Sequence, residues 1–538
     1  MASFFCQSLN YSKKFNKQIV MQLSNNQSIH QEGTGSSERW KPEKFSAEVL
    51  SIIFITLAAI SLRLYFSFSH ELISGMDGGY YPLQVRNILN TGFPVYPDFP
   101  LYFYFCALLI KSISFLGFTI NDGMIITVIK IVDSLALPML AFPLFRILTK
   151  SERKIPLFAK SAIVLFAVSS ATPLIILGDL QKNAFAIPFV FLFVWFFENY
   201  LITPEKRSLI AAVLSLVLIA LIHFGVFVFC LVFLILSLFV VYRKKAILPS
   251  IIVLFLGFAM ILMFDSNRAY RLLTFWNVIF ENPVLFQGPL PMHLLLNVII
   301  SLSLAASGFF QYLKYSGNNK VTEYLVFILS FVLVVFALPV YDSEYFNRFN
   351  VLLFVPQSLL ILYLIRMNQK FAVPVSILLI LITSFSIFTT ISEGKQPCID
   401  EVAYQDLQNL KKHLPDDKEN TIIIAEHGLE FWTAWALNVK VGQERAMNKI
   451  NSDKYRNITI LRQKNEVGRR GPGNRPGNRP MPGQRFKKGE HPPMGPSMEP
   501  PTGARSGQPN EPPMGPPLPE NFKLVYSSPY FNAYQNAD

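Results

Sequence analysis

Charged residues are scarce in this 538-residue chain: 15% are Asp, Glu, Lys or Arg, where a soluble domain carries about 25%. Half of the residues, 51%, are hydrophobic, and the run 208–242 contains no Asp, Glu, Lys or Arg at all. A segment of about 20 apolar residues spans a bilayer. The scarcity of charge therefore excludes a soluble enzyme with one core, and the number of apolar runs excludes a single-span anchor.

Cysteine is scarcer still. The four cysteines stand apart from one another, which excludes a disulfide-rich scaffold, and no His-rich or Cys-rich ligand spacing of a zinc site is present. The formal charge of +13 is not a nucleic-acid signal here. In a membrane protein, such an excess is expected in cytoplasmic loops that face anionic lipids. Membrane lipids, and no nucleic acid, are therefore the expected partners.

Apolar runs between charged breaks predict about eleven transmembrane helices. The first, 46–67, is expected to act as an uncleaved signal anchor because no cleavage site is readable before it. The run 208–242 is too long for one helix and is expected to break at His223. The remaining predicted spans are 122–147, 157–177, 183–202, 208–222, 225–242, 246–264, 290–313, 322–340, 348–366 and 371–391.

One apolar segment, 99–118, decides the orientation of everything after it. Lys111 in its middle and two prolines near its start favour a helix that lies in the membrane interface. With that assignment, the loops richest in Lys and Arg fall on one side, which the positive-inside rule places in the cytoplasm. We therefore expect a multi-pass protein of the plasma (inner) membrane, with a cytoplasmic N-terminus and an extracytoplasmic C-terminal domain.

The two ends of the chain differ in composition from this membrane part, 46–391. A polar cytoplasmic tail, expected to be disordered, covers 1–45. Residues 392–466 combine an amphipathic helix with a buried-strand pattern and predict a small outer α/β domain. The segment 467–520 is rich in Gly, Pro and Arg and is expected to be a disordered insert, while 521–538 returns as one strand of the outer domain. The predicted fold class is an all-α polytopic membrane protein with interfacial helices in its first outer loop and this small C-terminal domain.

The first predicted outer loop concentrates polar groups. Asp77 follows the first span by about ten residues and stands between glycines, and a polar helix over about 80–90 carries Arg86. The acids on the predicted outer side are Glu71, Asp77, Asp98, Asp122, Asp179, Asp265, Glu281, Asp342 and Glu344. Carboxylates gathered from separate loops are typical of a general-base or metal-assisted site. The plain alternative is that these acids only keep the outer loops soluble.

The pattern D-x-x-Y-Y, beginning at Asp77 and including Tyr80 and Tyr81, precedes a polar helix and N-x-G-x-P-x-Y-x-D-x-P-L. This sequence resembles the first outer loop of the GT-C superfamily of integral-membrane glycosyltransferases. That group includes oligosaccharyltransferases, protein O-mannosyltransferases and the aminoarabinose transferase of lipid A. Many members have Asp-Glu where this chain has Asp77-Gly78, which departs from the O-mannosyltransferase pattern.

The resemblance implies a second acid after the third span, a His or polar break at an outer helix end, and an Arg at the outer start of a late span. Asp179, His223 and Arg348 occupy these positions. It also implies a sugar donor carried on polyprenyl phosphate, and an acceptor that is a lipid, a glycan or a protein. Read alone, each residue has a plain alternative: a turn residue, a helix cap, a polar break between spans or an interfacial arginine.

Sugar transfer requires a base for the acceptor's proton and a cation for the leaving phosphate. We expect Asp77 to be the base and Asp179 to orient the acceptor. Arg348 is the first candidate for the phosphate and Lys182 the second. The remaining candidate substrate contacts are Tyr80, Tyr81, Arg86, Asp98 and His223. Whether a metal binds is open; if one does, Asp77 and Asp179 favour Mg²⁺ or Mn²⁺.

Other classes of protein were weighed against this hypothesis. A transporter or lipid-linked glycan flippase is the main alternative, although it would place polar groups at mid-membrane. A scaffold displaying the Pro-rich insert leaves the acidic first loop unexplained, and an O-antigen polymerase or ligase is a related possibility. Within the spans, Lys130 and Asp133 stand at i and i+3, where they are able to pair.

Overall fold

The computed structural model describes residues 47–150, 155–242, 247–314, 320–443, 455–464, 518–519 and 521–536. Nearly all of the described part belongs to one compact unit, Leu50–Asp538. The tail predicted over 1–45, and all but two residues of the insert predicted over 467–520, lie outside the described residues.

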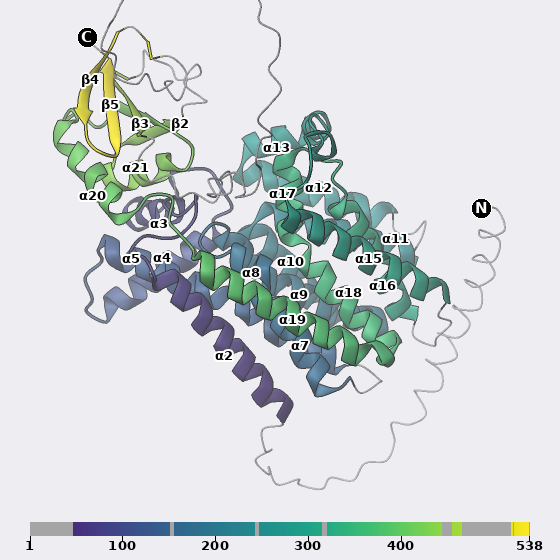
Figure 1. Ribbon diagram of the computed structural model, residues 1–538. Coiled ribbons are helices and arrows are strands. Elements are labelled where there is room, and N and C mark those ends of the chain that lie inside the picture. Colours follow the sequence, from purple (N-terminus) through teal and green to yellow (C-terminus); the bar gives the residue numbers. More distant parts are fainter. Residues whose placement is uncertain are drawn as a thin grey trace, which may run out of the picture. The chain divides into compact units, whose positions relative to one another are not determined.

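Helices make up the membrane part (Figure 1). The first twelve elements are α2 (Ala47–Phe68), α3 (Tyr80–Thr91), α4 (Leu101–Phe115), α5 (Asp122–Ala136), η1 (Leu137–Leu140), α6 (Ala141–Thr149), α7 (Leu157–Ser169), α8 (Ala171–Ile175), α9 (Gln181–Ile202), α10 (Lys206–Ile222), α11 (Phe224–Tyr242) and α12 (Ile247–Phe264). The next nine are α13 (Ser266–Leu273), α14 (Phe275–Ile279), η3 (Val284–Phe286), α15 (Met292–Lys314), α16 (Lys320–Ala337), α17 (Ser343–Leu352), α18 (Phe354–Met367), η4 (Gln369–Phe371) and α19 (Ala372–Glu393).

Among the described residues, nine helical segments are long and apolar enough to cross a membrane, and the bent pair α17–α18 makes a tenth. Of the eleven predicted spans, the one left over is 208–222, which corresponds to α10. This helix has 17 residues and a length of about 25 Å, slightly less than the thickness of the hydrocarbon core. The run 208–242 breaks as expected, because His223 adopts an extended conformation between α10 and α11. The predicted polytopic helical fold is confirmed.

Helix α4 lies within the segment 99–118, whose assignment to the membrane interface decides the predicted orientation of all later spans. It has 15 residues, so it is too short to cross a bilayer. Its end is strongly apolar and open: the side chain of Phe115 is 92% exposed and that of Leu116 is 74% exposed. This geometry suits a helix that lies in the interface, as the sequence predicts.

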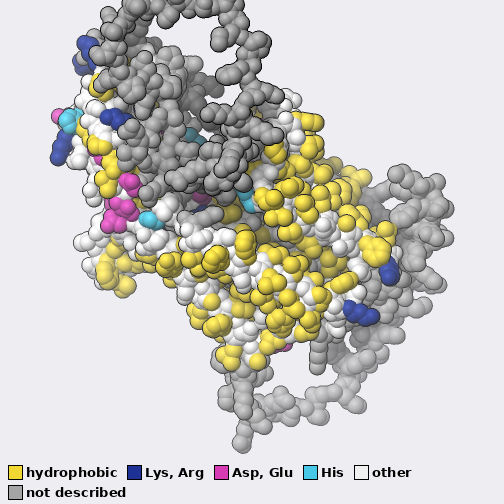
Figure 2. Space-filling view, viewed as in Figure 1, with side chains coloured by type: hydrophobic (Ala, Val, Ile, Leu, Met, Phe, Trp, Pro, Cys, Tyr) yellow, Lys and Arg dark blue, Asp and Glu magenta, His cyan; other side chains and the backbone are white. Residues whose placement is uncertain are grey.

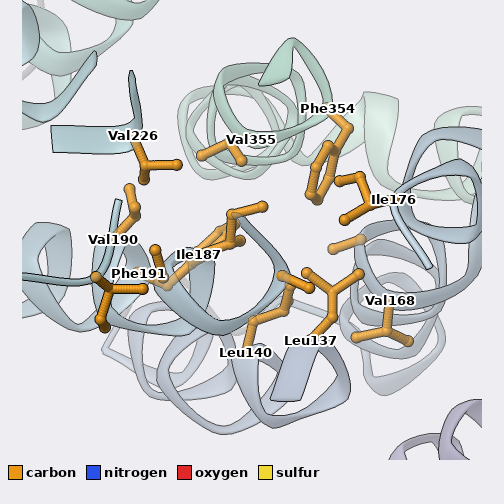
Figure 3. Packing of buried hydrophobic residues seen from close by; sticks show 14 of the residues in the cluster. Leu137, Leu140, Val168, Ile176, Ile187, Val190, Phe191, Val226, Phe354 and Val355 are labelled. Carbon is orange, nitrogen blue, oxygen red and sulfur yellow. The ribbon is translucent and has the colours of Figure 1, made fainter. Parts of the chain in front are cut away.

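The core of the bundle forms around α9. Ile187 of α9 faces Leu137 and Leu140 of η1, Val190 of α9 lies beside Val226, and Phe354 and Val355 lie across from them (Figure 3). These residues are buried because their helix carries apolar side chains on all faces, which is the pattern of a helix enclosed by others.

Hydrophobic side chains also cover the visible outer face of the helices (Figure 2). Exposed members include Phe54, Leu256, Met263, Phe385 and Phe388, which are 60–79% exposed. A continuous apolar surface of this kind is what lipid tails require of the protein that they contact.

The C-terminal domain is a five-stranded mixed sheet with helices beside it. Its elements are α20 (Glu401–Leu410), η5 (Lys411–His413), β1 (Thr421–Ala425), α21 (Leu429–Leu437), β2 (Lys440–Gln443), β3 (Asn457–Gln463), β4 (Phe522–Ser527) and β5 (Phe531–Asn536). The strand order is β2-β1-β3-β5-β4, and β1 runs parallel to both of its neighbours, with Ile423 opposite Val441 on β2 and Thr459 on β3.

The end of the chain differs in one respect from the prediction. Where one returning strand was expected, β4 and β5 form an antiparallel hairpin. The chain turns at Ser528, whose hydroxyl accepts from the main-chain N–H of Tyr530 and Phe531. Pro529 lacks an N–H and ends the first strand.

Candidate functional site

The loop between α2 and α3 is folded tightly around its glycines. Gly75 has φ +90° and donates its N–H to the carbonyl of Gln396 at 3.0 Å. A Cβ atom on Gly75 would lie 1.9 Å from Oδ1 of Asp179, and one on Gly79 would lie 2.7 Å from the main-chain nitrogen of Trp432. The loop reaches the Asp179 segment and α21 this closely only because those side chains are absent.

Asp179 contacts the loop that carries Asp77. Oδ1 of Asp179 accepts hydrogen bonds from the main-chain N–H of Met76 and, at 3.4 Å, of Asp77. Burial raises the pKa of Asp179. Burial, followed by the negative charge of Asp179, raises the pKa of Asp77 to about 6. In the described part of the chain, no group hydrogen-bonds to the Asp77 carboxyl, so its oxygens keep their capacity to accept a hydrogen bond or a proton.

Two cations face these acids from other elements. The positive charge of Arg348, on α17, lowers the pKa of Asp77, and that of Lys395, just after α19, lowers the pKa of Asp179. The Arg348 side chain is 68% exposed and pairs with Glu344 at 2.5 Å. Lys395 is half-buried and donates to the carbonyl of Ile175 at 2.8 Å. Arg348 therefore lies within electrostatic reach of Asp77, and Lys395 within electrostatic reach of Asp179.

The C-terminal domain adds two titratable groups that the sequence did not single out. Nδ1 of His427 lies 2.9 Å from Oε1 of Glu430, and Gln443 donates to the same oxygen at 2.8 Å. Glu430 is buried, and its Oε2 has no hydrogen-bond partner in the described ranges. The charge of His427 lowers the pKa of Asp77 and that of Glu430 raises it, so both lie within electrostatic reach of the first loop.

A sequence signal for this pair was present. His427 follows β1 by two residues, and β1 is the central strand of three parallel ones. Side chains just past the carboxyl ends of parallel strands commonly form ligand sites. The strand pattern TIIIA therefore pointed to His427, whereas nothing in the sequence marked Lys395.

Asp98 and Lys182 form a buried ion pair rather than two open contacts. Their side chains are 5% and 8% exposed, and the hydroxyl of Tyr80 donates to Oδ2 of Asp98 at 2.5 Å. Gln84 donates to the Tyr80 oxygen at 3.0 Å. Lys182 and Arg348 each have a carboxylate partner, but the Lys182–Asp98 pair is buried whereas the Arg348–Glu344 pair is exposed, which makes Arg348 the better candidate for the phosphate.

Tyr81 holds the Asp179 segment in place. Its hydroxyl donates to the main-chain carbonyl of Asp179 at 2.9 Å and accepts from the N–H of Gln181 at 3.1 Å. Burial raises its pKa well above the usual value, so the hydroxyl stays protonated. In this structure Tyr81 acts on the position of Asp179.

Arg86 and His223 make their contacts elsewhere. The guanidinium of Arg86 lies 4.1 Å from the ring centre of Trp435 and donates to that residue's carbonyl at 2.9 Å, which joins α3 to α21. Nδ1 of His223 accepts from the N–H of Val226 at 3.2 Å, at the start of α11. Their expected contacts with substrate stay predictions.

The fit of a divalent cation can be judged from the donors. No group of three His, Cys, Asp or Glu side chains suited to a metal ion occurs among the described residues. Oδ1 of Asp179 is already occupied by two main-chain N–H groups. Mg²⁺ is normally held by one or two carboxylates, with water and substrate phosphate completing its six oxygen ligands, so the role of Asp77 and Asp179 as metal ligands stays a prediction.

No protein-family profile and no curated protein matches the sequence. Among solved structures, the chain is similar to the crystal structure of an oligosaccharyltransferase of Archaeoglobus fulgidus in complex with Zn and sulfate. The TM-score is 0.48, the sequence identity is 13%, and the alignment covers 76% of this chain and 67% of that chain. This likeness concerns the course of the backbone, and no role of a side chain follows from it.

Proposed function

We propose that this protein is a membrane glycosyltransferase that moves a sugar from a polyprenyl-phosphate donor to an acceptor at the membrane surface. One observation carries the proposal. The Asp77 carboxyl accepts no hydrogen bond from the described residues and has a pKa of about 6, and it lies within electrostatic reach of Asp179 and the exposed Arg348. A poised base beside an accessible cation is what phosphate displacement by a hydroxyl or amide needs.

Asp77 takes the acceptor's proton. As the acceptor oxygen or nitrogen bonds to the anomeric carbon, its proton moves to a carboxylate oxygen of Asp77. The bond from the anomeric carbon to the phosphate oxygen breaks, and its electron pair leaves with the phosphate. A base with a pKa near the working pH is the most effective in such a transfer. Direct displacement inverts the configuration at the anomeric carbon.

Arg348 receives the departing phosphate. Its guanidinium offers several N–H donors in one plane, and a bidentate contact with phosphate stabilises the charge that develops there. Glu344, which holds it at 2.5 Å, is 63% exposed, so this partner can move away when phosphate arrives. Asp179 orients the acceptor.

The donor's lipid tail fits the surface of the bundle. The helices carry large exposed apolar side chains, and a polyprenyl chain lies in the bilayer with its phosphate at the surface. We place the site and the C-terminal domain on the outer face of the plasma membrane, with the N-terminus inside, in keeping with the distribution of Lys and Arg.

A transporter is less well supported. Transporters place open polar groups at mid-membrane. Here the buried charges of the described spans have protein partners: Arg63 pairs with Asp133 at 3.2 Å, and Arg366 with Glu198 at 2.6 Å.

Profiling of lipid-linked sugars by mass spectrometry tests the proposal. Cells that lack the gene are expected to accumulate one polyprenyl-phosphate sugar and to lose its product, and the intact gene is expected to reverse both changes. Asp77→Asn is expected to fail to reverse them. Asp416→Asn, at an exposed carboxyl of the C-terminal domain, serves as the matched control and is expected to restore the profile. An unchanged profile in cells without the gene would contradict the proposal.

A further inference from the structure

The segment that carries Asp179 is held by charged side chains through its main chain. Residues 173–178 read PLIILG, so their own side chains are apolar and offer no polar attachment. Nη1 of Arg63 donates to the carbonyl of Pro173 at 2.7 Å, and Oδ2 of Asp133 accepts from the N–H of Gly178 at 2.8 Å. The two groups therefore bind the first and the last residue of the segment.

Arg63 and Asp133 also bind each other. Nη2 of Arg63 lies 3.2 Å from Oδ1 of Asp133 and donates to that residue's main-chain carbonyl at 3.1 Å. Arg63 is 0% exposed and Asp133 is 1% exposed. They stand on α2 and α5, two helices that the sequence marks as membrane spans. Charges buried in such helices are costly and are normally kept for a function.

This pairing differs from the one that sequence spacing allowed. Lys130 and Asp133 share a helix face, but Lys130 instead donates to the carbonyls of His70 and Glu71, at 2.5 and 2.8 Å. Asp133 is thereby left to Arg63 and Gly178. The reason is geometric: the open carbonyls at the end of α2 lie beside Lys130, while Arg63 reaches Asp133 from the preceding span.

The conformation of Gly178 makes its hydrogen bond to Asp133 important. Gly178 has φ +84°, and a Cβ there would lie 2.4 Å from the carbonyl oxygen of Ser74. The turn therefore presses against the first loop and directs the next residue, Asp179, at the N–H groups of Met76 and Asp77. A displacement at Gly178 passes directly to both acids of the site.

We infer that Arg63 and Asp133 are positioning residues, a buried ion pair that fixes the Pro173–Gly178 segment and thereby sets the distance between Asp179 and Asp77. Neither residue touches substrate. The consequence for sugar transfer rests on the proposed function. The claim that the ion pair holds the segment in place does not.

The test compares two buried ion pairs. Removing one partner alone leaves a buried charge unpaired and endangers folding, whereas replacing both partners with apolar side chains is often tolerated. The test variant is therefore Arg63→Met with Asp133→Leu. The matched control is Glu198→Leu with Arg366→Met, an equally buried pair. Glu198 stands 17 residues after Gln181 on α9, about 25 Å along the helix from the site.

Two measurements are made on the full-length protein in lipid nanodiscs. Hydrogen–deuterium exchange is followed over 173–181 and 74–79, and transfer is measured with the lipid-linked sugar that accumulates in cells lacking the gene. The test variant is expected to exchange at least tenfold faster in both segments and to lose at least tenfold in kcat, with KM for the donor changed by less than threefold. The control is expected to match the wild type in both. Arg63→Lys, which keeps the charge but loses the forked guanidinium donors, is expected to fall between them.

Unchanged exchange in the test variant, or equal acceleration in both double variants, would overturn the inference. Faster exchange with normal kcat would overturn the link between the position of this segment and the reaction. The exchange result needs no substrate. It therefore decides the claim about position even if Asp77→Asn restored the wild-type sugar profile, a result that would contradict the proposed function instead.

Discussion

The carboxylate of Asp179 accepts a hydrogen bond from the main-chain N–H of Asp77, at 3.4 Å. The two acids stand 102 positions apart in the sequence, yet Asp179 lies beside the half-buried Asp77. The charge of Asp179 contributes to the raised pKa of Asp77. Burial, together with the charge of Asp179, gives Asp77 the proton affinity that a base needs near neutral pH. The contact with Asp179 also makes the site depend on the exact fit of one glycine loop.

The close packing of this glycine loop predicts the effect of adding one methyl group to Gly75. Gly75→Ala places a Cβ 1.9 Å from Asp179 Oδ1 at φ +90°, so we expect transfer to fall at least tenfold. Gly117→Ala is the matched control, because Gly117 has φ +96° and no atom within 4 Å of its Cβ position. Both variants bear backbone strain of about 1–2 kcal/mol, and only the first displaces an acid. Equal losses of activity in the two variants, measured at equal expression, would show that strain alone matters.

The activity is expected to depend on pH with a sign fixed by Asp77. The base acts when deprotonated, so kcat/KM should be level above a pKa of about 6 and fall about tenfold per pH unit below it. A profile without this acidic limb between pH 5 and 7 would contradict the role of Asp77.

Substitutions of two charged neighbours of Asp77 should move the acidic limb of the pH profile in opposite directions. The negative charge of Asp179 raises the pKa of Asp77, so Asp179→Asn is expected to move the limb to lower pH. The positive charge of His427 lowers that pKa, so His427→Gln is expected to move the limb to higher pH. His413→Gln, at an exposed histidine of the C-terminal domain, is the control and should leave the limb in place. Shifts of the same sign in both test variants would rule out this electrostatic account.

Arg348 should govern the donor. Arg348→Ala removes a charge-assisted contact worth about 1.5–3 kcal/mol, so KM for the lipid-linked sugar is expected to rise at least tenfold. Arg348→Lys keeps the charge without the planar fork and should lie between. Arg146→Ala, at an exposed arginine on α6, is the control for loss of surface charge. Initial rates against donor concentration decide the matter, and an unaltered KM in Arg348→Ala would remove this residue from the phosphate site.

The spans were predictable because lipid imposes a local requirement. Each apolar run of the sequence is a helix, and the break at His223 is visible as a polar residue two positions before a glycine. The small C-terminal domain was predictable from an equally local pattern, since a buried strand such as TIIIA shows its burial in five consecutive residues.

The partners of the charged side chains were not predictable, because they are set by contacts between distant segments. Asp98 meets Lys182 from 84 positions away, and Asp133 meets Arg63 from 70 positions away in place of its helix neighbour Lys130. Lys395 and His427 reach the first loop only once the C-terminal domain packs on it. Sequence patterns report burial and period along one segment, but they do not report which loops meet.

The most direct test of the central claim is the rate of sugar transfer by Asp77→Asn in purified, folded protein. Asparagine keeps the size of the side chain but cannot accept the acceptor's proton. The account predicts a loss of about 10²- to 10⁴-fold in kcat, with the protein still inserted in the membrane and the donor still bound. Transfer within threefold of the wild type would contradict it.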